Sequence, residues 1–153
     1  MSQSQKTNWG QFIPLVTVFF FWGFVAASNE ILIPVFKKSF DLSQAESQLV
    51  AVAYYIAYTV GALIYMGVSL LAKQDLINKF GYKNSLSFGL LLSAIGTLFF
   101  IPAANTGSFP LMLTGLFTVG LGFSLQQTVA NPLAIALGDA STGSQRLTLA
   151  GGI

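Results

Sequence analysis

Residues 12–36 read FIPLVTVFFFWGFVAASNEILIPVF, an apolar run whose main polar interruption is the trio Ser28, Asn29 and Glu30. At about 1.5 Å per residue, a helix of this length reaches roughly 37 Å and can cross a bilayer with some tilt. The run is too long for a strand of a membrane barrel, which alternates apolar and polar residues over roughly ten positions. It therefore predicts a transmembrane helix.

The composition extends this conclusion to the whole chain. Of its 153 residues, 54% are hydrophobic and 8% are charged, whereas about a quarter of an average soluble domain is charged. So few polar residues cannot cover the surface of a soluble domain of this size. The predicted fold class is an all-α integral membrane protein.

The composition also argues against several functions. The chain has no cysteine and no histidine, which removes disulfides, thiolate nucleophiles, histidine relays and the usual zinc ligands. We therefore expect no enzyme activity, no metal site and no cofactor other than a coupling proton. The net charge of +2 is too small for a surface that binds nucleic acid.

Four apolar runs are long enough to be complete transmembrane helices. We expect these helices at 12–36, 49–72, 85–101 and 109–137, the start of a fifth at 147–153, a cytoplasmic N-terminus at 1–11 and cytoplasmic loops at 73–84 and 138–146. The short loop at 73–84 predicts that the second and third helices are antiparallel neighbours. Thr142 and Gln145 have capping-box spacing for the fifth helix. Because the chain stops inside an apolar segment, we expect it to be the first part of a longer protein.

The distribution of basic residues predicts the orientation in the membrane. One side carries Lys6, Lys73, Lys79, Lys83 and Arg146, and the other carries only Lys37 and Lys38. Loops rich in lysine and arginine stay in the cytoplasm, so the N-terminus should be cytoplasmic. We expect a multi-pass protein of the inner (cytoplasmic) membrane.

Glu30 is the only acid inside a predicted span. Burying a carboxylate in a membrane is costly, so such residues usually mark the path of an ion or a substrate. The small residues Gly23, Ala26 and Ala27 flank its face and leave room for a neighbouring helix or a ligand. We predict that Glu30 carries the coupling proton. The alternative is that Glu30 lies at the outer interface and pairs with Lys37.

A polar segment, QQTVANPL at 126–133, lies within the fourth predicted span. Gln127 and Asn131 stand four residues apart on one helix face, and Pro132 removes a helix hydrogen bond and predicts a kink. Amides can both donate to and accept from sugar hydroxyl groups. Gln127, Gln126 and Asn131 are therefore candidate substrate-binding residues. The alternative is that they only form hydrogen bonds between helices.

Tyr58 is a candidate in the second predicted span, because a tyrosine ring can flank a sugar and its hydroxyl group can bind one. The alternative is simple packing or a place in an interfacial aromatic belt. Small residues in the third and fourth spans predict close packing between helices. They are Gly89, Ala94, Gly96, Gly115, Gly120 and Gly122.

Four features of the chain also carry a family resemblance. They are FFFWGF at 19–24 with NEILIPVFKKSF at 29–40, AYYIAY at 53–58, GTLFFIPAAN at 96–105, and LGFSLQQTVANPLAIALG at 121–138 with SQRLTLA at 144–150. In order and spacing they resemble the fucose/glucose/galactose:proton symporter family of the major facilitator superfamily. The resemblance implies about twelve spans in two six-helix halves around a central site with alternating access. This chain would then be an incomplete N-terminal half.

The same resemblance implies roles for residues of the membrane spans. The Asn-acid pair of the family's first helix falls on Asn29 and Glu30, which makes Asn29 a candidate for substrate binding and Glu30 the protonated carboxylate. Fucose-type members have an acid at the position of Gln127, so Gln127 favours a glucose/galactose-like sugar. Thr148 and Gly151 replace an Asn and a Gln that are frequent in relatives.

The superfamily's cytoplasmic loop motif is only loosely kept in this chain. It falls around Lys79 and Gly81, with Asp75 as the candidate gating residue. Arg146 belongs to the next predicted cytoplasmic loop.

The predicted function is therefore proton-coupled symport of a hexose-type sugar, with glucose or galactose favoured over fucose. Its partners would be the sugar, protons, the lipid bilayer and the remaining helices of the same chain. The alternative is a truncated fragment that does not transport, or a membrane protein that serves in interaction or assembly. Continuation of the gene beyond Ile153 into further spans would favour transport, and an immediate stop codon would favour the alternative.

Overall fold

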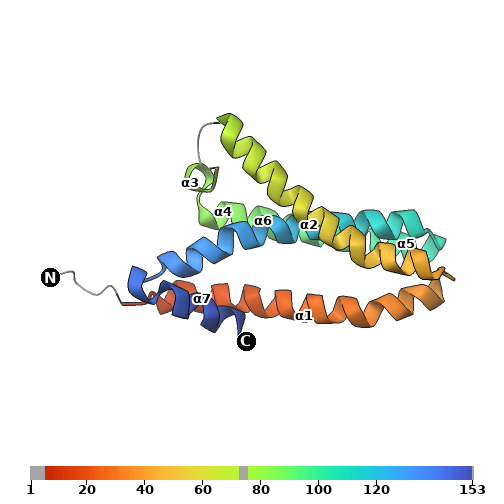
Figure 1. The fold of residues 1–153 in the computed structure, drawn as a ribbon, viewed down its shortest axis with the longest axis horizontal. Helices are drawn as coiled ribbons and strands as arrows, with labels where there is room; N and C mark the ends of the chain where they lie inside the picture. The colour runs from red at the N-terminus through yellow and green to blue at the C-terminus, as the bar shows by residue number, and fades with distance from the viewer. Residues whose placement is uncertain (1–5, 73–75, 153) are drawn as a thin grey trace.

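The computed structural model describes residues 6–72 and 76–152, and in this part of the chain all regular structure is helical (Figure 1). The elements are α1 (Trp9–Ser39), α2 (Gln44–Ala72), α3 (Leu76–Phe80), α4 (Tyr82–Leu98), α5 (Phe100–Thr106), α6 (Phe109–Ala136), the 3-10 helix η1 (Ala140–Thr142) and α7 (Gly143–Gly151).

Four helical stretches are long and apolar enough to cross a membrane. They are Trp9–Ser28 within α1, Gln44–Ala72, Tyr82–Thr106 across α4 and α5, and Phe109–Ala136. This confirms the predicted all-α membrane fold and its four spans.

The start of α2 differs from the predicted span because of a cap. α2 begins at Gln44, earlier than the predicted start at residue 49. The backbone N and the Oγ of Ser43 donate to Glu46 Oε2 at 2.9 and 2.7 Å, and Glu46 N donates back to Ser43 Oγ at 3.2 Å. This capping box satisfies backbone groups that the first turn of a helix leaves unpaired, so α2 extends beyond the apolar run.

The third predicted span is divided into two helices. α4 ends at Leu98 and α5 begins at Phe100. Pro102 has no N–H to donate to the carbonyl of Leu98, so the ladder of helix hydrogen bonds is interrupted at this point.

α7 begins at Gly143, beside the predicted capping box, but the box itself is not formed. Thr142 makes no side-chain cap bond to α7. Its Oγ1 donates to the Asp139 carbonyl at 3.1 Å and accepts from Arg146 Nη1 at 2.7 Å. The prediction of a capping box at Thr142 and Gln145 is therefore wrong, because Arg146 takes the threonine hydroxyl.

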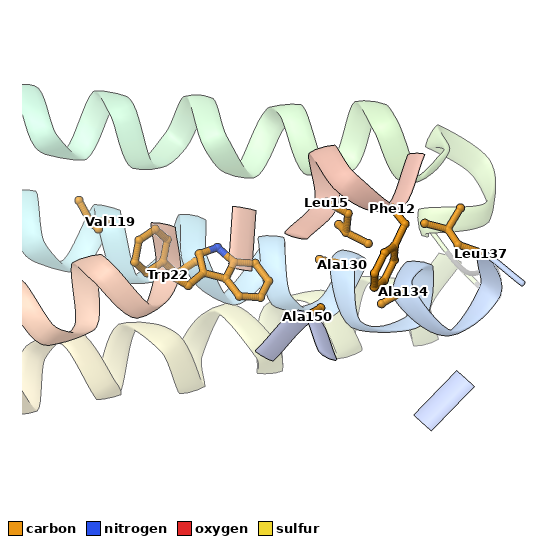
Figure 2. Close-up of a cluster of buried hydrophobic side chains, with 9 residues drawn as sticks. Phe12, Leu15, Trp22, Val119, Ala130, Ala134, Leu137 and Ala150 are labelled. Atoms are coloured by element: carbon orange, nitrogen blue, oxygen red, sulfur yellow. The ribbon is translucent and has the colours of Figure 1, made fainter. Parts of the chain in front are cut away.

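α6 lies at the centre of the bundle. α2 and α4 pack along α6 from opposite sides and hardly touch each other (Figure 2). The prediction that the second and third spans are neighbours is therefore wrong, since α6 lies between them.

Glycines on α4 and α6 allow this arrangement, because they bring the two backbones into contact. A Cβ atom on Gly96 would lie 2.7 Å from the backbone nitrogen of Val119, and one on Gly89 would lie 3.0 Å from the carbonyl oxygen of Gly122. A Cβ atom on Gly115 would lie 2.9 Å from the Gly96 carbonyl oxygen. Small residues permit such close approach of helices in a membrane, so the predicted packing role of these glycines is confirmed.

A glycine also brings α6 close to α2, on the opposite side of α6 from α4. A Cβ atom on Gly120 would lie 2.8 Å from the Cβ of Ala57 in α2, which confirms the packing role of Gly120. Ala94 is different, because it is exposed. The contact of α4 with α6 therefore does not use Ala94, and its packing role stays a prediction.

An apolar cluster joins α1 and α7 to α6 (Figure 2). Phe12 and Leu15 of α1 lie beside Ala134 of α6 and Leu137, which directly follows α6, and the ring of Trp22 lies further along. Its buried members are Phe12, Leu15, Trp22, Val119, Phe123, Ala130, Ala134, Leu137 and Ala150.

Gly96→Ala should destabilise the protein by about 1 to 3 kcal/mol, because the new methyl group overlaps the backbone of α6. Gly67→Ala is the matched control, since a Cβ atom on Gly67 would meet nothing within 4 Å. That variant should be neutral, or stabilising by about 0.5 to 1 kcal/mol, because alanine is the better helix former. Unfolding in detergent measures both. Equal stability of the two variants would contradict the close contact of α4 with α6.

Candidate substrate-binding site

Gln126 is fully buried in α6, and its side-chain amide joins three helices. Its Oε1 accepts a hydrogen bond from Trp22 Nε1 of α1 at 2.9 Å. Its Nε2 donates to the Gly89 carbonyl at 3.1 Å and to Ser93 Oγ at 2.8 Å, both on α4. Both amide hydrogens are thus used within the protein. Of the two interpretations of Gln126, this geometry favours hydrogen bonding between helices over contact with a substrate.

The neighbouring Gln127 points to a different helix. Its Oε1 accepts a hydrogen bond from the Tyr58 hydroxyl of α2 at 2.8 Å, and both side chains are half-buried. Its Nε2 has no hydrogen-bond acceptor among the residues that the structure describes. The structure thus brings two predicted site residues together and leaves an oriented amide with two hydrogens to donate. Such a group can bind hydroxyl oxygens.

Asn131 and Pro132 follow on α6. Asn131 is half-buried, and Pro132 is exposed on the surface of the bundle. α6 continues through Pro132 to Ala136, so the proline does not interrupt the helix. Asn131 therefore stays on the helix that carries Gln127, one turn away.

Glu30 is exposed on α1 and forms neither an ion pair nor a hydrogen bond with the described part of the chain. Lys37, its alternative partner, instead donates to Gln44 Oε1 at 2.6 Å. The structure therefore does not support pairing of Glu30 with Lys37. It does not join Glu30 to Gln127 by a hydrogen bond either. The side chain of Asn29 lies outside the described part of the structure.

Arg146 is buried, with 4% of its surface exposed, although the sequence places it in a cytoplasmic loop. Its guanidinium group donates to the carbonyls of Ala134 at 3.0 Å, Ile135 at 2.5 Å and Asp139 at 2.8 Å. The first two carbonyls belong to the last turn of α6, where carbonyls lack helix partners and the helix dipole is negative. Assignment of Arg146 to the loop is thus wrong, because it lies within α7 and caps α6.

The other predicted loop residues lie around α3. Gly81 joins α3 to α4 with a φ of 80°, a backbone conformation that glycine adopts without steric cost. Lys79 is exposed in α3, and Asp75 lies outside the described residues. In the described part of the chain, no group of three or more acidic, histidine or cysteine residues could hold a metal ion.

Sequence reasoning missed two parts of this arrangement. Trp22 lies in an apolar run, and only the rule that a buried indole N–H needs an acceptor hints at its partner. The S-x-x-E pattern at Ser43 and Glu46, by contrast, is a readable capping signal.

A model of the Major Facilitator Superfamily matches residues 2–153 of the chain. The chain belongs to this superfamily. Membership confirms the resemblance described from the sequence and the prediction that the chain is not an enzyme.

Individual members show the same likeness. A glucose/galactose transporter of Brucella abortus biovar 1 (strain 9-941) is 37% identical over 148 residues, which cover 97% of this chain and 34% of that protein. An L-fucose-proton symporter of Escherichia coli (strain K12) is 35% identical over 139 residues, which cover 91% of this chain and 30% of that protein. This chain therefore spans about a third of the length of these curated relatives.

A solved structure extends the likeness to the arrangement of helices. The crystal structure of FucP, a Major Facilitator Superfamily transporter in the outward conformation, matches with a TM-score of 0.72 and 34% identity. The match covers 92% of this chain and 32% of that chain. The contacts of Gln126 and Gln127 thus lie within a Major Facilitator Superfamily bundle.

Gln126→Leu should destabilise this Major Facilitator Superfamily bundle by about 1 to 3 kcal/mol, because it leaves the buried Trp22 Nε1–H without an acceptor. Trp22→Phe breaks the same bond from the other side. The double variant should therefore lose less stability than the sum of the two single losses, by about 0.5 kcal/mol or more. Unfolding in detergent measures this coupling, with exposed Gln48→Leu as the control. Strictly additive losses would show that the bond does not link α1 to α6.

Proposed function

We propose that the protein is a secondary active transporter that couples proton influx to the uptake of a hexose-type sugar. The observation that supports this most directly is the pair of Gln127 and Tyr58, which leaves the amide nitrogen of Gln127 without an acceptor in the described structure. The names of the relatives, a glucose/galactose transporter and an L-fucose-proton symporter, support the same substrate class and the proton. In this proposal the protein lies in the inner membrane with its N-terminus in the cytoplasm.

Gln127 would donate to the sugar while Tyr58 holds it in place. The Tyr58 hydroxyl donates to Gln127 Oε1, which directs the amide oxygen toward α2 and leaves Nε2 to face another ligand. A sugar hydroxyl oxygen is a suitable acceptor, and the remaining lone pair of the tyrosine oxygen can accept a sugar hydroxyl hydrogen in turn. Asn131, one turn further along α6, and Asn29 of α1 would add amide contacts. A neutral glutamine at this place favours glucose or galactose over fucose.

Glu30 would bind the coupling proton. Its carboxylate has no basic partner in the described structure, and the one nearby candidate, Lys37, is bonded to Gln44. In the sequence Glu30 is the only acid of the first apolar run, and such residues usually mark the path of an ion. If the protonated form favours sugar binding, bound sugar must favour protonation by the same factor. A proton gradient then drives accumulation of the sugar.

Gln127→Ala should weaken sugar binding by about ten- to a hundredfold, the loss of roughly 1 to 3 kcal/mol expected when a site loses one hydrogen bond. Binding of glucose and galactose to the complete protein, measured by calorimetry, tests this. Gln48→Ala is the control, because Gln48 is an exposed glutamine on α2. Unchanged affinity of Gln127→Ala for every transported sugar would make Gln127 a packing residue.

Glu30→Gln should retain sugar binding and sugar exchange but lose uphill uptake, because the amide keeps the shape of the side chain and cannot carry a proton. Proteoliposomes with an imposed proton gradient distinguish accumulation from exchange. Asp41→Asn is the matched acid-to-amide control: Asp41 is exposed and has a φ of 51°, a conformation that asparagine tolerates. Proton-driven accumulation by Glu30→Gln at the wild-type level would exclude Glu30 as the proton carrier.

A further inference from the structure

A groove of about 590 Å³ lies between α2 and α4, along one face of α6. Val68 of α2 and Phe88 of α4 belong to its two walls, Leu121 and Leu125 of α6 form its floor, and Phe80 of α3 lies at one end. The groove exists because α2 leaves the bundle toward Ala72 while α4 stays on α6 (Figure 1). Its volume is in the range of ligand-binding pockets in proteins, about 300 to 1,000 Å³.

The groove runs along only part of α2. At its inner end, α2 closes on α6, because a Cβ atom on Gly61 would lie 2.8 Å from Ser124 Cβ. From Gly61 to Val68 the groove extends about 10 Å along α2 at about 1.5 Å per residue. Half of the hydrocarbon core is about 15 Å thick. A lipid acyl chain occupies one half of the bilayer, so a groove of this length suits it.

The groove is apolar along its depth and polar at one end, which matches a lipid with an apolar chain and a polar head group. Its depth is lined by aliphatic and aromatic side chains such as Leu92 and Phe88, and polar side chains, Asn84 and Ser85, lie on the first turn of α4. A sugar would find few hydrogen-bond partners among such walls. An acyl chain needs none, and it carries its polar end at the membrane surface.

Positive charge lies at the same end of the groove. Lys79 and Lys83 are exposed on either side of Gly81, next to the groove residues Phe80 and Asn84. By sequence, the segment 73–83 holds three lysines and one aspartate, a net charge of +2. Basic groups between helices at a membrane surface attract anionic lipid head groups.

We propose that this groove binds one acyl chain of an anionic phospholipid, with the phosphate group held by Lys79 and Lys83. The site lies on a different part of α2 from Tyr58, and the proposal does not rest on the proposed sugar transport. It needs only the groove and the two lysines.

Native mass spectrometry of the complete protein tests the proposal, with phosphatidylglycerol and phosphatidylcholine of identical acyl chains as probes. One phosphatidylglycerol molecule should be retained with at least a roughly tenfold preference over phosphatidylcholine, as expected for two lysines at a membrane surface. Lys79→Gln with Lys83→Gln should abolish this preference. Lys37→Gln with Lys38→Gln, at the other end of the bundle, should leave it unchanged. Equal retention of the two lipids by the unaltered protein would overturn the proposal.

A second pair of variants tests the groove itself. Val68→Trp fills it, and Val52→Trp is the matched control, because the two valines lie on the same helix and are 43% and 44% exposed. Val68→Trp should lose the retained lipid and Val52→Trp should keep it. Retention by Val68→Trp would place the lipid elsewhere and overturn the proposal.

Labelling distinguishes a lipid from a protein occupant. Val68→Cys in a complete protein cleared of other cysteines should react with a lipid-soluble maleimide in lipid-free detergent and be protected when phosphatidylglycerol is added. Val52→Cys should react in both conditions. Protection of Val68→Cys without lipid would show that another helix of the chain fills the groove, and the proposal would fail.

Discussion

The contact between the backbones of α4 and α6 determines where the remaining helices can lie. In a bilayer the lipid is as apolar as the side chains, so helices associate through packing and hydrogen bonds and gain little from excluding water. Glycines at the crossing, such as Gly96 against Val119, remove the side chains that would hold the helices apart. The same closeness lets the Gln126 amide reach the carbonyl of Gly89. A larger residue at Gly89 or Gly96 would therefore push α4 away from α6 and also disturb the hydrogen bond between Gln126 and Gly89.

Two neighbouring glutamines on α6 have different surroundings because successive helix residues point about 100° apart, at 3.6 residues per turn. Gln126 points between α1 and α4, where three protein groups satisfy its amide. Gln127 points toward α2, where Tyr58 binds only its oxygen. Because Gln126 is buried away from water, its amide must find hydrogen-bond partners within the protein; an unpaired amide in that position would be costly. The half-buried position of Gln127 carries no such requirement, so a ligand can complete its hydrogen bonds.

Much of the fold could be predicted from the sequence, since a transmembrane helix is a local property of an apolar run. The position of α6 between α2 and α4 could not be predicted. The short loop between α2 and α4 suggests that these two helices are neighbours, and the pattern of glycines does not identify the helix against which each one packs. The role of Arg146 depends on the end of α6, twelve residues earlier in the chain, and loop position alone suggests an exposed charge. For the site, pattern reasoning identified the polar residues of α6, but only the structure separates Gln126 from Gln127.

Gly61 connects the proposed sugar site with the proposed lipid site through α2. On one side of it, one turn away, Tyr58 binds Gln127, and on the other side α2 diverges from α6 along the groove. At Gly61 itself α2 lies against Ser124 of α6. This contact marks the point at which α2 stops packing on α6 and begins to diverge from it. A helix is stiff over a few turns, and a ligand that fills the groove would set the angle at which α2 leaves α6. The Tyr58 hydroxyl lies on the same rigid element, so its distance from Gln127 depends on that angle.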